Sequence, residues 1–553
     1  MAEERVWLKN YPKGVPANID ADKFATVEEM LKGCFAKYKD KVAFSNMGKD
    51  LTFGDLDTYS KQFGAYLQYR GLKAGDKIAL MMPNLLQYPI ALFGALRAGI
   101  IVVNTNPLYT PREMKHQFTD AGVKAVVIAE NYAANLEKII ADTDINVTIV
   151  TPLGEMLGMI KGTIVNLMVK HVKRLVPKYN LNNTVSFKQA LSEGKRMKLA
   201  EHEGKPNDTI LIQYTGGTTG VSKGAELTNK NLVANMLQVQ SYMFQFLTDG
   251  EEVALSPLPM YHIFAFTVHC LALLSIGTKN VLVTNARDLP SIIKEFNQKE
   301  PISIMTGVNT LFNGLIAQEN FAAANFEKLK FAVGGGMAVQ PHVAEKWQKI
   351  TGKPLIEGFG MTESSPVASC NPIDGTDKIG TIGMPLPSTE MRIVDEDLNV
   401  LAQGQRGEIQ IRGPQVMKGY YNRAQATTDT IKDGWLCTGD IGLMDEDGFF
   451  KIVDRKKDMI LVSGFNVYPN EIEAVLASHP KISEAAAIGV PDPKSTEAVK
   501  VFIVKSDSSL TIEEVKTFCA ANMTGYKKPK HIEFKDDLPK SNVGKILRRK
   551  LKE

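Results

Sequence analysis

Cysteine is scarce in this sequence, and the cysteines present form no recognisable site. They are odd in number, far apart and never paired as C-x-x-C; they are Cys34, Cys270, Cys370, Cys437 and Cys519. This spacing excludes a disulfide framework and a cysteine-rich zinc site, and it is typical of proteins kept in a reducing compartment. We therefore expect a cytoplasmic protein.

Long apolar runs are also missing. No stretch has the ~20 uninterrupted apolar residues that a membrane-spanning helix needs, so we expect no transmembrane segment. The start of the chain, residues 1–7, is acidic and lacks an apolar core, so we expect no secretory signal.

The nearest approach to an apolar run, residues 156–176, is interrupted by cations. Its apolar residues recur at helical spacing: Ile160, Ile164, Leu167, Met168, Val172 and Leu175. The pattern predicts a basic amphipathic helix, which can lie on an anionic bilayer. That interpretation makes the protein peripheral on the inner face of the cytoplasmic membrane. The alternative is an ordinary surface helix packed on its own domain.

A strong charge of either sign is absent as well. The net charge is +4 over 553 residues, and the basic excess near the end, residues 527–552, shows no aromatic base-stacking pattern interleaved with its cations. We therefore expect no nucleic-acid partner. A hydrophobic content of 44% with 23% charged residues is ordinary for a globular protein. The length is too great for one core, so two or more domains are expected.

The order of apolar runs predicts the fold class. Between residues 40 and 360, continuous runs such as 77–82 and 331–333 alternate with helical patterns, as in parallel sheets covered on both faces. Gly/Pro turns and short strands then follow over 378–425. We predict an α/β protein, with an N-terminal domain (1–456) of two α/β subdomains plus a small β-barrel or distorted sheet. A small mobile α+β domain (457–553) follows.

The most informative segment is the loop from Tyr214 to Gly224. It contains four glycines, four threonine or serine hydroxyls and one lysine, after the apolar run 210–212. Glycines allow backbone N–H groups to converge on an anion, and hydroxyls and a lysine add donors and charge. The composition therefore predicts a phosphate-binding loop rather than a flexible linker.

Two other motifs overlap this loop. Its end reads Ser222-Lys223-Gly224, which reverses the Gly-Lys-Ser/Thr order of a Walker A loop. Residues 220–224 match G-x-S-x-G, the nucleophile elbow of esterases, which requires a strand that runs straight into the turn. An esterase is kept as a weak alternative.

Further motifs supply what a nucleotide site needs. Residues 331–336 end an apolar run in three glycines, and residues 357–363 combine glycines with an aromatic ring, a hydroxyl and a carboxylate. These suit an adenine platform, a phosphate contact and a hard oxygen ligand for Mg²⁺. Asp440 in a glycine turn could bind ribose hydroxyls, although Asp in such a turn is usually only turn chemistry. Arg455 and Lys545 alone would pass for surface cations.

Taken in order, these motifs resemble those of the adenylate-forming superfamily, and most closely the bacterial long-chain fatty-acid–CoA ligases. The likeness covers essentially the whole chain. Residues 433–457 also resemble the fatty-acyl-CoA synthetase signature, and residues 463–469 resemble the loop that follows it.

The resemblance implies a role for each matching residue. The phosphates would contact the loop residues Thr215, Gly216, Gly217, Thr218, Thr219, Gly220 and Lys223. The adenine would lie against Gly335, Gly336, Phe359 and Gly360, with Phe359 standing where many members carry tyrosine. The ribose would be held by Asp440 and Arg455.

The resemblance also implies the catalytic groups. Thr362 would contact the α-phosphate, Glu363 would hold Mg²⁺, and Lys545 would be the catalytic lysine. Lys457 falls at the hinge between the domains. His262 matches an aromatic segment that lines the acyl pocket, although a structural histidine is an equal alternative.

The implied activity is that of a long-chain-fatty-acid–CoA ligase, which forms acyl-AMP from a fatty acid and ATP with Mg²⁺ and then transfers the acyl group to CoA. It would feed fatty acid uptake and β-oxidation. Acyl-AMP ligases, aryl-CoA ligases and luciferases share the fold, and a non-catalytic lipid-binding membrane protein is the alternative from another class. Assembly into a homodimer is left open.

Overall fold

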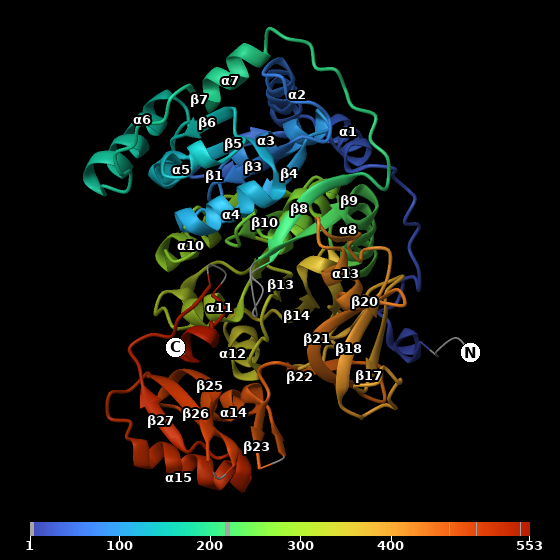
Figure 1. Ribbon diagram of the computed structural model, residues 1–553, viewed down its shortest axis with the longest axis vertical. Helices are drawn as coiled ribbons and strands as arrows, with labels where there is room; N and C mark the ends of the chain where they lie inside the picture. The colour runs from blue at the N-terminus through green and yellow to red at the C-terminus, as the bar shows by residue number, and fades with distance from the viewer. Residues whose placement is uncertain (1–4, 216–221, 464, 494, 542–543, 553) are drawn as a thin grey trace.

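The computed structural model describes residues 5–215, 222–463, 465–493, 495–541 and 544–552 (Figure 1). Two large mixed sheets and an antiparallel sheet form the N-terminal part, and a fourth sheet forms the C-terminal part. In Figure 1 the C-terminal sheet lies at the bottom, below the nine-stranded sheet. The predicted α/β class, with a large N-terminal domain and a small C-terminal one, is confirmed.

The first large sheet has eight strands in the order β19-β9-β8-β4-β3-β5-β6-β7. They are β3 (Lys77–Met81), β4 (Ile101–Asn104), β5 (Val123–Ala129), β6 (Val147–Thr151), β7 (Thr184–Ser186), β8 (Thr209–Thr215), β9 (Lys223–Thr228) and β19 (Gly419–Tyr420). All pairs from β8 to β7 are parallel, and β9 returns antiparallel to β8.

Both faces of this sheet are covered. Along β3, Ile78 and Leu80 face one apolar core while Ala79 and Met81 face another. This explains why the strand reads as an unbroken apolar run. The surrounding helices are α1 (Val27–Lys37), α2 (Phe53–Tyr69), α3 (Gln87–Arg97), α4 (Pro111–Ala121), α5 (Ala133–Glu137), α6 (Met159–Leu167) and α7 (Phe187–Gly194).

The second large sheet has nine strands in the order β16-β15-β14-β13-β12-β10-β11-β1-β2. They are β1 (Val42–Asn46), β2 (Lys49–Thr52), β10 (Val253–Ser256), β11 (Lys279–Leu282), β12 (Ile304–Gly307), β13 (Phe331–Gly334), β14 (Leu355–Gly360), β15 (Val367–Cys370) and β16 (Met384–Pro385). Its helices are α8 (Asn229–Met243), α9 (Ile263–Ala265), α10 (Leu289–Phe296), α11 (Asn309–Ile316) and α12 (Pro341–Thr351).

The predicted small β unit is a five-stranded antiparallel sheet accompanied by α13 (Ala424–Thr430). Its strands are β17 (Glu390–Val394), β18 (Gly407–Arg412), β20 (Ile431–Lys432), β21 (Trp435–Met444) and β22 (Phe450–Arg455). The end of β22 leads directly to the linker that enters the C-terminal part.

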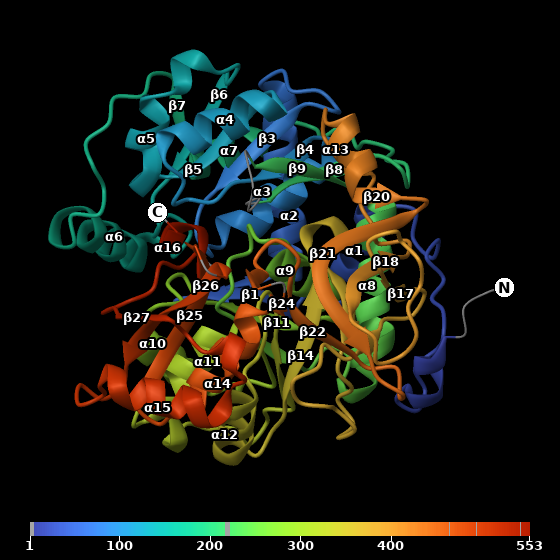
Figure 2. The same cartoon turned by 60° about the horizontal axis from the view of Figure 1, so that its bottom comes forward.

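The C-terminal part is a five-stranded sheet with helices, as predicted. It contains β23 (Ile460–Val462), β24 (Phe465–Val467), β25 (Ile482–Asp492), β26 (Thr496–Lys505) and β27 (His531–Phe534), with α14 (Pro469–Ala477), α15 (Ile512–Asn522) and α16 (Arg549–Lys552). The tail that ends in α16 packs back on β25, and within it Gly544 meets Thr310 of α11 in the N-terminal part (Figures 1 and 2).

The predicted amphipathic helix over residues 156–176 is shorter than expected. It comprises α6 and one π-helical turn, Met168–Val172. Gly162 packs against the backbone of Gly154, where a Cβ on Gly162 would lie 2.3 Å from the Gly154 carbonyl oxygen. The apolar side chains point outward, and the most exposed are Met159 (83%) and Ile160 (76%). The helix thus packs on its own domain through Gly162 while its apolar face stays exposed, and both interpretations of the helix stay predictions.

Candidate functional site

The predicted phosphate loop connects two antiparallel strands. β8 ends at Thr215 and β9 begins at Lys223, and these two residues are cross-strand partners. Gly216, Gly217, Thr218, Thr219 and Gly220 lie outside the described residues.

This hairpin argues against the esterase alternative. A nucleophile elbow joins a strand to a helix, whereas the residues after Ser222 form β9, antiparallel to β8. The nearby His116 places its Nε2 3.1 Å from the backbone oxygen of Ser222, so its hydrogen bond goes to the main chain. The motif over residues 220–224 is therefore a coincidence of composition.

Lys223, Tyr420 and Glu363 form a connected group. The Lys223 ammonium lies over the Tyr420 ring, 5.1 Å from its centroid, and the Tyr420 hydroxyl donates to Glu363 Oε1 at 2.6 Å. Strand β19 brings Tyr420 beside β9, where it pairs with Ala225. The predicted phosphate lysine and the predicted metal ligand are therefore joined through one tyrosine that the sequence did not single out.

Glu363 sits in a one-turn 3₁₀ helix, Thr362–Ser364, directly after β14. Only 6% of Glu363 is exposed. Burial raises the pKa of its carboxyl, while the Tyr420 hydrogen bond and the charges of Arg455 and Lys223 oppose that rise. Thr362 belongs to the same turn, so the predicted α-phosphate contact and metal ligand are adjacent.

The predicted adenine platform is built by two glycine-rich strand ends. Gly335 follows β13, and a Cβ on it would approach the Phe264 ring at 3.0 Å and the Gly358 carbonyl oxygen at 3.2 Å. Gly360 ends β14 with a Cβ position only 1.9 Å from the Pro366 oxygen, so no larger residue fits. Gly336 takes a φ of +75°, which suits glycine. Phe359 is half-buried between these turns.

Asp440 and Arg455 are cross-strand partners on β21 and β22. Arg455 Nε lies 3.0 Å from Asp440 Oδ1, and Asp440 is 4% exposed. Burial raises the pKa of Asp440, while Arg455, Lys545 and Lys457 act against that rise. A cavity of about 320 Å³ beside them is lined by Thr438, Gly439, Arg455, Lys456 and Lys457.

Lys545 reaches this group from the C-terminal part. Burial and the charges of Arg455 and Lys457 lower the pKa of Lys545 to about 8, and Asp440 opposes that shift. Gly544, at a φ of +76°, seats the loop on α11, where a Cβ would lie 2.4 Å from Thr310 Oγ1. The structure therefore brings the C-terminal lysine to residues of the N-terminal part.

Arg548 anchors the segment that follows this lysine. Its guanidinium contacts Glu473 Oε2 at 2.7 Å and Asp458 Oδ2 at 3.2 Å, and it donates to Asn470 Oδ1. Asp454, at the end of β22, lies 3.8 Å away and accepts the Asn470 N–H at 2.7 Å. The contacts therefore involve Asp454 and Asp458, which lie on either side of Lys457, the predicted hinge, in the sequence.

His262 caps α9, where its Nδ1 accepts the Phe264 N–H at 3.3 Å. Burial, together with the charge of Lys545, lowers the pKa of His262 to about 4. A neutral imidazole therefore faces the region of the lysine, which is compatible with both the structural and the acyl-pocket interpretations.

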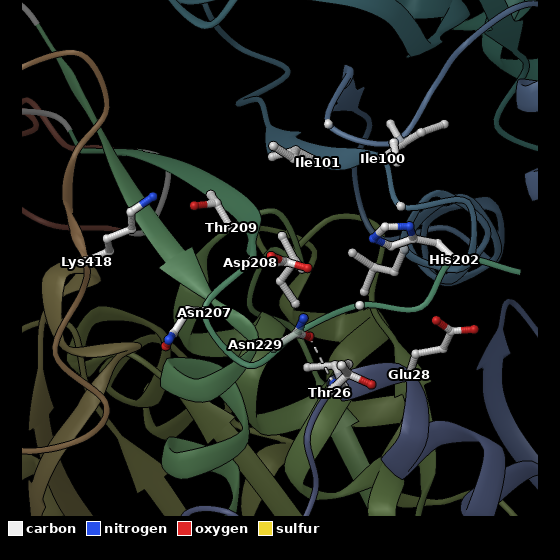
Figure 3. A pocket seen from close by; sticks show the side chains of 17 residues that line it. Thr26, Glu28, Ile100, Ile101, His202, Asn207, Asp208, Thr209, Asn229 and Lys418 are labelled. Atoms are coloured by element: carbon white, nitrogen blue, oxygen red, sulfur yellow. Dashed lines mark hydrogen bonds between the residues drawn. The ribbon is translucent and has the colours of Figure 1, made fainter.

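A second cavity, of about 440 Å³, lies at the opposite end of β8 (Figure 3). Thr209, at the start of β8, is on its wall with His202, Asp208 and Lys418. None of the predicted site residues lines it. Within the described residues, no group of three or more His, Cys, Asp or Glu side chains could hold a metal ion.

Comparison with known proteins gives full-length matches. A chain from Yersinia pestis named long-chain-fatty-acid–CoA ligase is 54% identical over 551 residues, covering 100% of this chain and 98% of the relative. A chain of the same name from Bacillus subtilis is 36% identical over 556 residues, with the same coverage. The crystal structure of ATP-bound MatB from Rhodopseudomonas palustris is 26% identical, has a TM-score of 0.81, and covers 95% of this chain and 98% of that one.

Two family descriptions match in succession. Residues 32–421 match the AMP-binding enzyme family, and residues 471–545 match the AMP-binding enzyme C-terminal domain. Together they include both large sheets and the segment that delivers Lys545. The chain therefore belongs to the AMP-binding enzyme family.

Proposed function

We propose that this protein is a long-chain-fatty-acid–CoA ligase. A fatty carboxylate attacks the α-phosphate of ATP, an acyl-AMP forms and pyrophosphate leaves; the CoA thiol then displaces AMP to give the thioester. The observation that carries the proposal is the convergence of Lys223, Glu363, Asp440, Arg455 and Lys545 from separate elements. The full-length relatives named for this activity support the acyl class. The reaction would consume fatty acid brought in by uptake, and its acyl-CoA product would feed β-oxidation.

The first half-reaction brings two anions together. At 4 Å and an effective dielectric constant of about 20, two unit charges repel by about 4 kcal/mol, which is about a thousandfold in rate. Lys223 and Lys545 are cations that offset this repulsion. Catalysis is then mainly positioning and charge stabilisation, with no covalent enzyme intermediate.

Nucleotide binding is assigned by position. The loop between β8 and β9, from Thr215 to Lys223, binds the phosphates, and its residues 216–220 contribute the backbone donors. The glycine turns at Gly335 and Gly360 accept the flat adenine beside Phe359. Asp440 binds the ribose hydroxyls, and Arg455 holds its carboxylate in place.

The residues present fit a magnesium ion that arrives with ATP. Mg²⁺ is usually held by one or two carboxylates together with substrate phosphates and water, and Glu363 is one buried carboxylate whose second oxygen, Oε2, is free of the Tyr420 bond. The ion, when bound, neutralises phosphate charge. Tyr420 orients the carboxylate, and Lys223 is close enough to share the phosphates.

The C-terminal part serves both half-reactions. In the arrangement described, Lys545 is inserted for adenylation, with Lys457 as the hinge between domains 1–456 and 457–553. Rotation about Lys457 withdraws Lys545 and opens a path for CoA, a common use of a hinge.

The exposed face of α6 is proposed to rest on an anionic membrane. The outward apolar side chains of α6 are Met159, Ile160, Ile164 and Leu167, and those of the residues directly after it are Met168, Val172 and Leu175. Cations flank them, including Lys173 and Arg174. None of the helices in the described ranges is long and apolar enough to cross a bilayer. The protein would be peripheral on the inner face of the cytoplasmic membrane, with contact between two copies through α6 as the competing outcome.

One experiment tests the activity directly. The purified protein is incubated with Mg·ATP, CoA and either oleate or benzoate, and pyrophosphate, AMP and free thiol are measured. We expect all three signals to change with oleate and not with benzoate. Activity with benzoate alone would identify an aryl-CoA ligase. Release of pyrophosphate without thiol consumption would identify an acyl-AMP ligase, and no release at all would leave a lipid-binding protein.

A further inference from the structure

The segment that leads to His262 is held by a buried amide from the other large sheet. After β10, residues 257–262 cross between the nine-stranded and eight-stranded sheets. Gln213 of β8 donates from Nε2 to the Tyr261 carbonyl oxygen at 3.1 Å. Tyr261 directly precedes His262, so this bond fixes the main chain where the predicted acyl-pocket residue begins.

The Gln213 side chain is itself oriented by a hydrogen bond from Asn104. Its Oε1 accepts from Asn104 Nδ2 at 3.1 Å, and Asn104 Oδ1 accepts from the Tyr88 hydroxyl at 2.7 Å. Both residues are nearly inaccessible, with Asn104 2% and Tyr88 0% exposed. The hydrogen bonds run in one direction, from Tyr88 through Asn104 and Gln213 to Tyr261, and each amide orientation is determined by its neighbours.

The same strand position is close to the phosphate loop. Gln213 and Thr215 lie two residues apart, on the same face of β8. The side chain of Tyr214, on the other face, donates to Asp120 Oδ2 at 2.7 Å instead. One short piece of β8 therefore contacts the segment of His262 and begins the loop assigned to the phosphates.

A second buried amide fixes the earlier part of the segment. Asn84 donates to the carbonyl oxygens of Ser256 at 3.1 Å and Leu258 at 2.8 Å, and it accepts the Met260 N–H at 2.8 Å. Tyr261 is the next residue, and the bond from Gln213 completes the set. The segment is thus held through its backbone, so its register depends on Asn84 and Gln213.

From these contacts we propose that Gln213 is a positioning residue, which fixes the Tyr261–His262 segment relative to the phosphate loop and so aligns the fatty carboxylate with the α-phosphate. The inference rests on the proposed function. An apolar residue of the same size would leave the Tyr261 oxygen and the Asn104 amide without partners. A buried polar group without a partner shifts or admits water, and the alignment is then lost.

The test is Gln213→Met, which conserves volume and removes both hydrogen bonds. We expect the KM for oleate to rise and the single-turnover rate of acyl-AMP formation to fall, each by about tenfold, the equivalent of one hydrogen bond. The Kd for ATP, measured without fatty acid, should change less than about twofold. The reason is that the hydrogen bonds of Gln213 go to Tyr261 and Asn104, and neither is among the residues assigned to the nucleotide. A loss of oleate affinity without loss of ATP affinity is not expected from general destabilisation.

Gln238→Met is the matched control. Gln238 is a buried amide of α8 whose hydrogen bonds go to Pro387, Thr389, Gln415 and Asn235 instead of the Tyr261 segment. It should lower Tm by a similar amount and leave the KM for oleate unchanged. Tyr88→Phe, which removes only the far end of the chain of bonds, should shift the KM in the same direction by less, and it serves if Gln213→Met does not fold.

The outcomes separate two failures. If the wild-type protein releases no pyrophosphate with oleate, the proposed function is wrong. If the wild-type protein is active, and Gln213→Met leaves the KM for oleate unchanged or moves it no more than Gln238→Met does, Gln213 is only a structural residue and the inference is overturned.

Discussion

Gly544 and Thr310 touch across the boundary between the two ends of the chain. A Cβ on Gly544 would lie 2.4 Å from Thr310 Oγ1 and 3.4 Å from a methyl group of Val308, and the φ of Gly544 is +76°. Both the space and the backbone conformation require glycine at this point. The contact therefore belongs to the arrangement in which Lys545 is inserted, and it offers a way to disfavour that arrangement alone.

Gly544→Ala should slow acyl-AMP formation by at least about tenfold, because the added methyl group clashes with Thr310 and the positive φ is unfavourable for alanine. Thioester formation from supplied acyl-AMP and CoA should be retained. Single-turnover kinetics of each half-reaction measure the two effects. Gly525→Ala is the control, because nothing lies within 4 Å of a Cβ there. Equal slowing of both half-reactions by Gly544→Ala would contradict the two-arrangement mechanism.

Lys545→Ala should reduce acyl-AMP formation by about 10²–10³-fold, the usual effect of removing one group that stabilises transition-state charge. The second half-reaction, started from acyl-AMP and CoA, should change little. Lys550→Ala removes an exposed cation from the same tail and should affect neither. A Lys545→Ala protein that forms acyl-AMP at the normal rate would remove this lysine from the mechanism.

Acyl-AMP formation should fall as the pH rises through about 8. The pKa of Lys545 is lowered from 10.5 to about 8, so its charge, which offsets the repulsion of the anions, is lost above that pH. The free energy of unfolding depends on pH in the opposite direction. Between pH values of about 8 and 10.5, Lys545 binds a proton in the unfolded chain but not in the folded one, so this group makes the free energy of unfolding increase with pH.

The measurement is a pH profile of the first half-reaction, with Lys545→Arg for comparison. Arginine keeps its charge across this range, so the alkaline decline should flatten even if the maximal rate is lower. An unchanged decline in the arginine variant would assign the titration to another group.

Glu363→Gln should raise the Mg²⁺ concentration needed for pyrophosphate release by at least roughly tenfold, because a carboxylate ligand is replaced by a neutral amide of the same size. The Tyr420 hydroxyl can still donate to the amide oxygen, so the fold should be retained. Glu226→Gln, on the neighbouring strand β9, is the control. An unchanged Mg²⁺ dependence in Glu363→Gln would refute its assignment as a metal ligand.

Replacing Ile160 and Val172 with serine should reduce sedimentation with anionic vesicles by at least about tenfold, because each apolar side chain contributes about 1.5–3 kcal/mol when buried. The paired control is Ile379→Ser with Val400→Ser, which removes exposed apolar side chains outside α6.

Lys173 and Arg174 replaced by glutamine should weaken binding further and make it less sensitive to salt. If the serine variants bind vesicles normally but lose a dimer seen by light scattering, α6 is a contact between copies.

Local patterns in the sequence predict much of this structure. The apolar runs at 77–82 and 331–333 become β3 and β13, because a buried parallel strand must be apolar on both faces. The glycines of the nucleotide motifs are recognisable because close backbone approach leaves no room for a Cβ, as at Gly360.

Contacts between distant segments are not predictable in this way. Tyr420 reaches Glu363 only because β19 pairs with β9, and the amino-acid sequence around Tyr420 gives no indication of that pairing. Gln213 meets Tyr261 across two sheets. For α6, the helical period correctly predicts one apolar face, but the direction of that face depends on Gly162 packing against Gly154.

Arg548 gives the C-terminal tail a mechanical property. Its guanidinium ties the stretch after Lys545 to Glu473 in α14 and to Asp458 just past Lys457, so the tail cannot bend freely relative to its own sheet. In the proposed rotation, Lys545 and the C-terminal sheet therefore move together as one rigid body about Lys457. Withdrawal of the lysine and reorientation of the sheet then become a single step with a single barrier, and the rate of that step sets an upper limit on turnover.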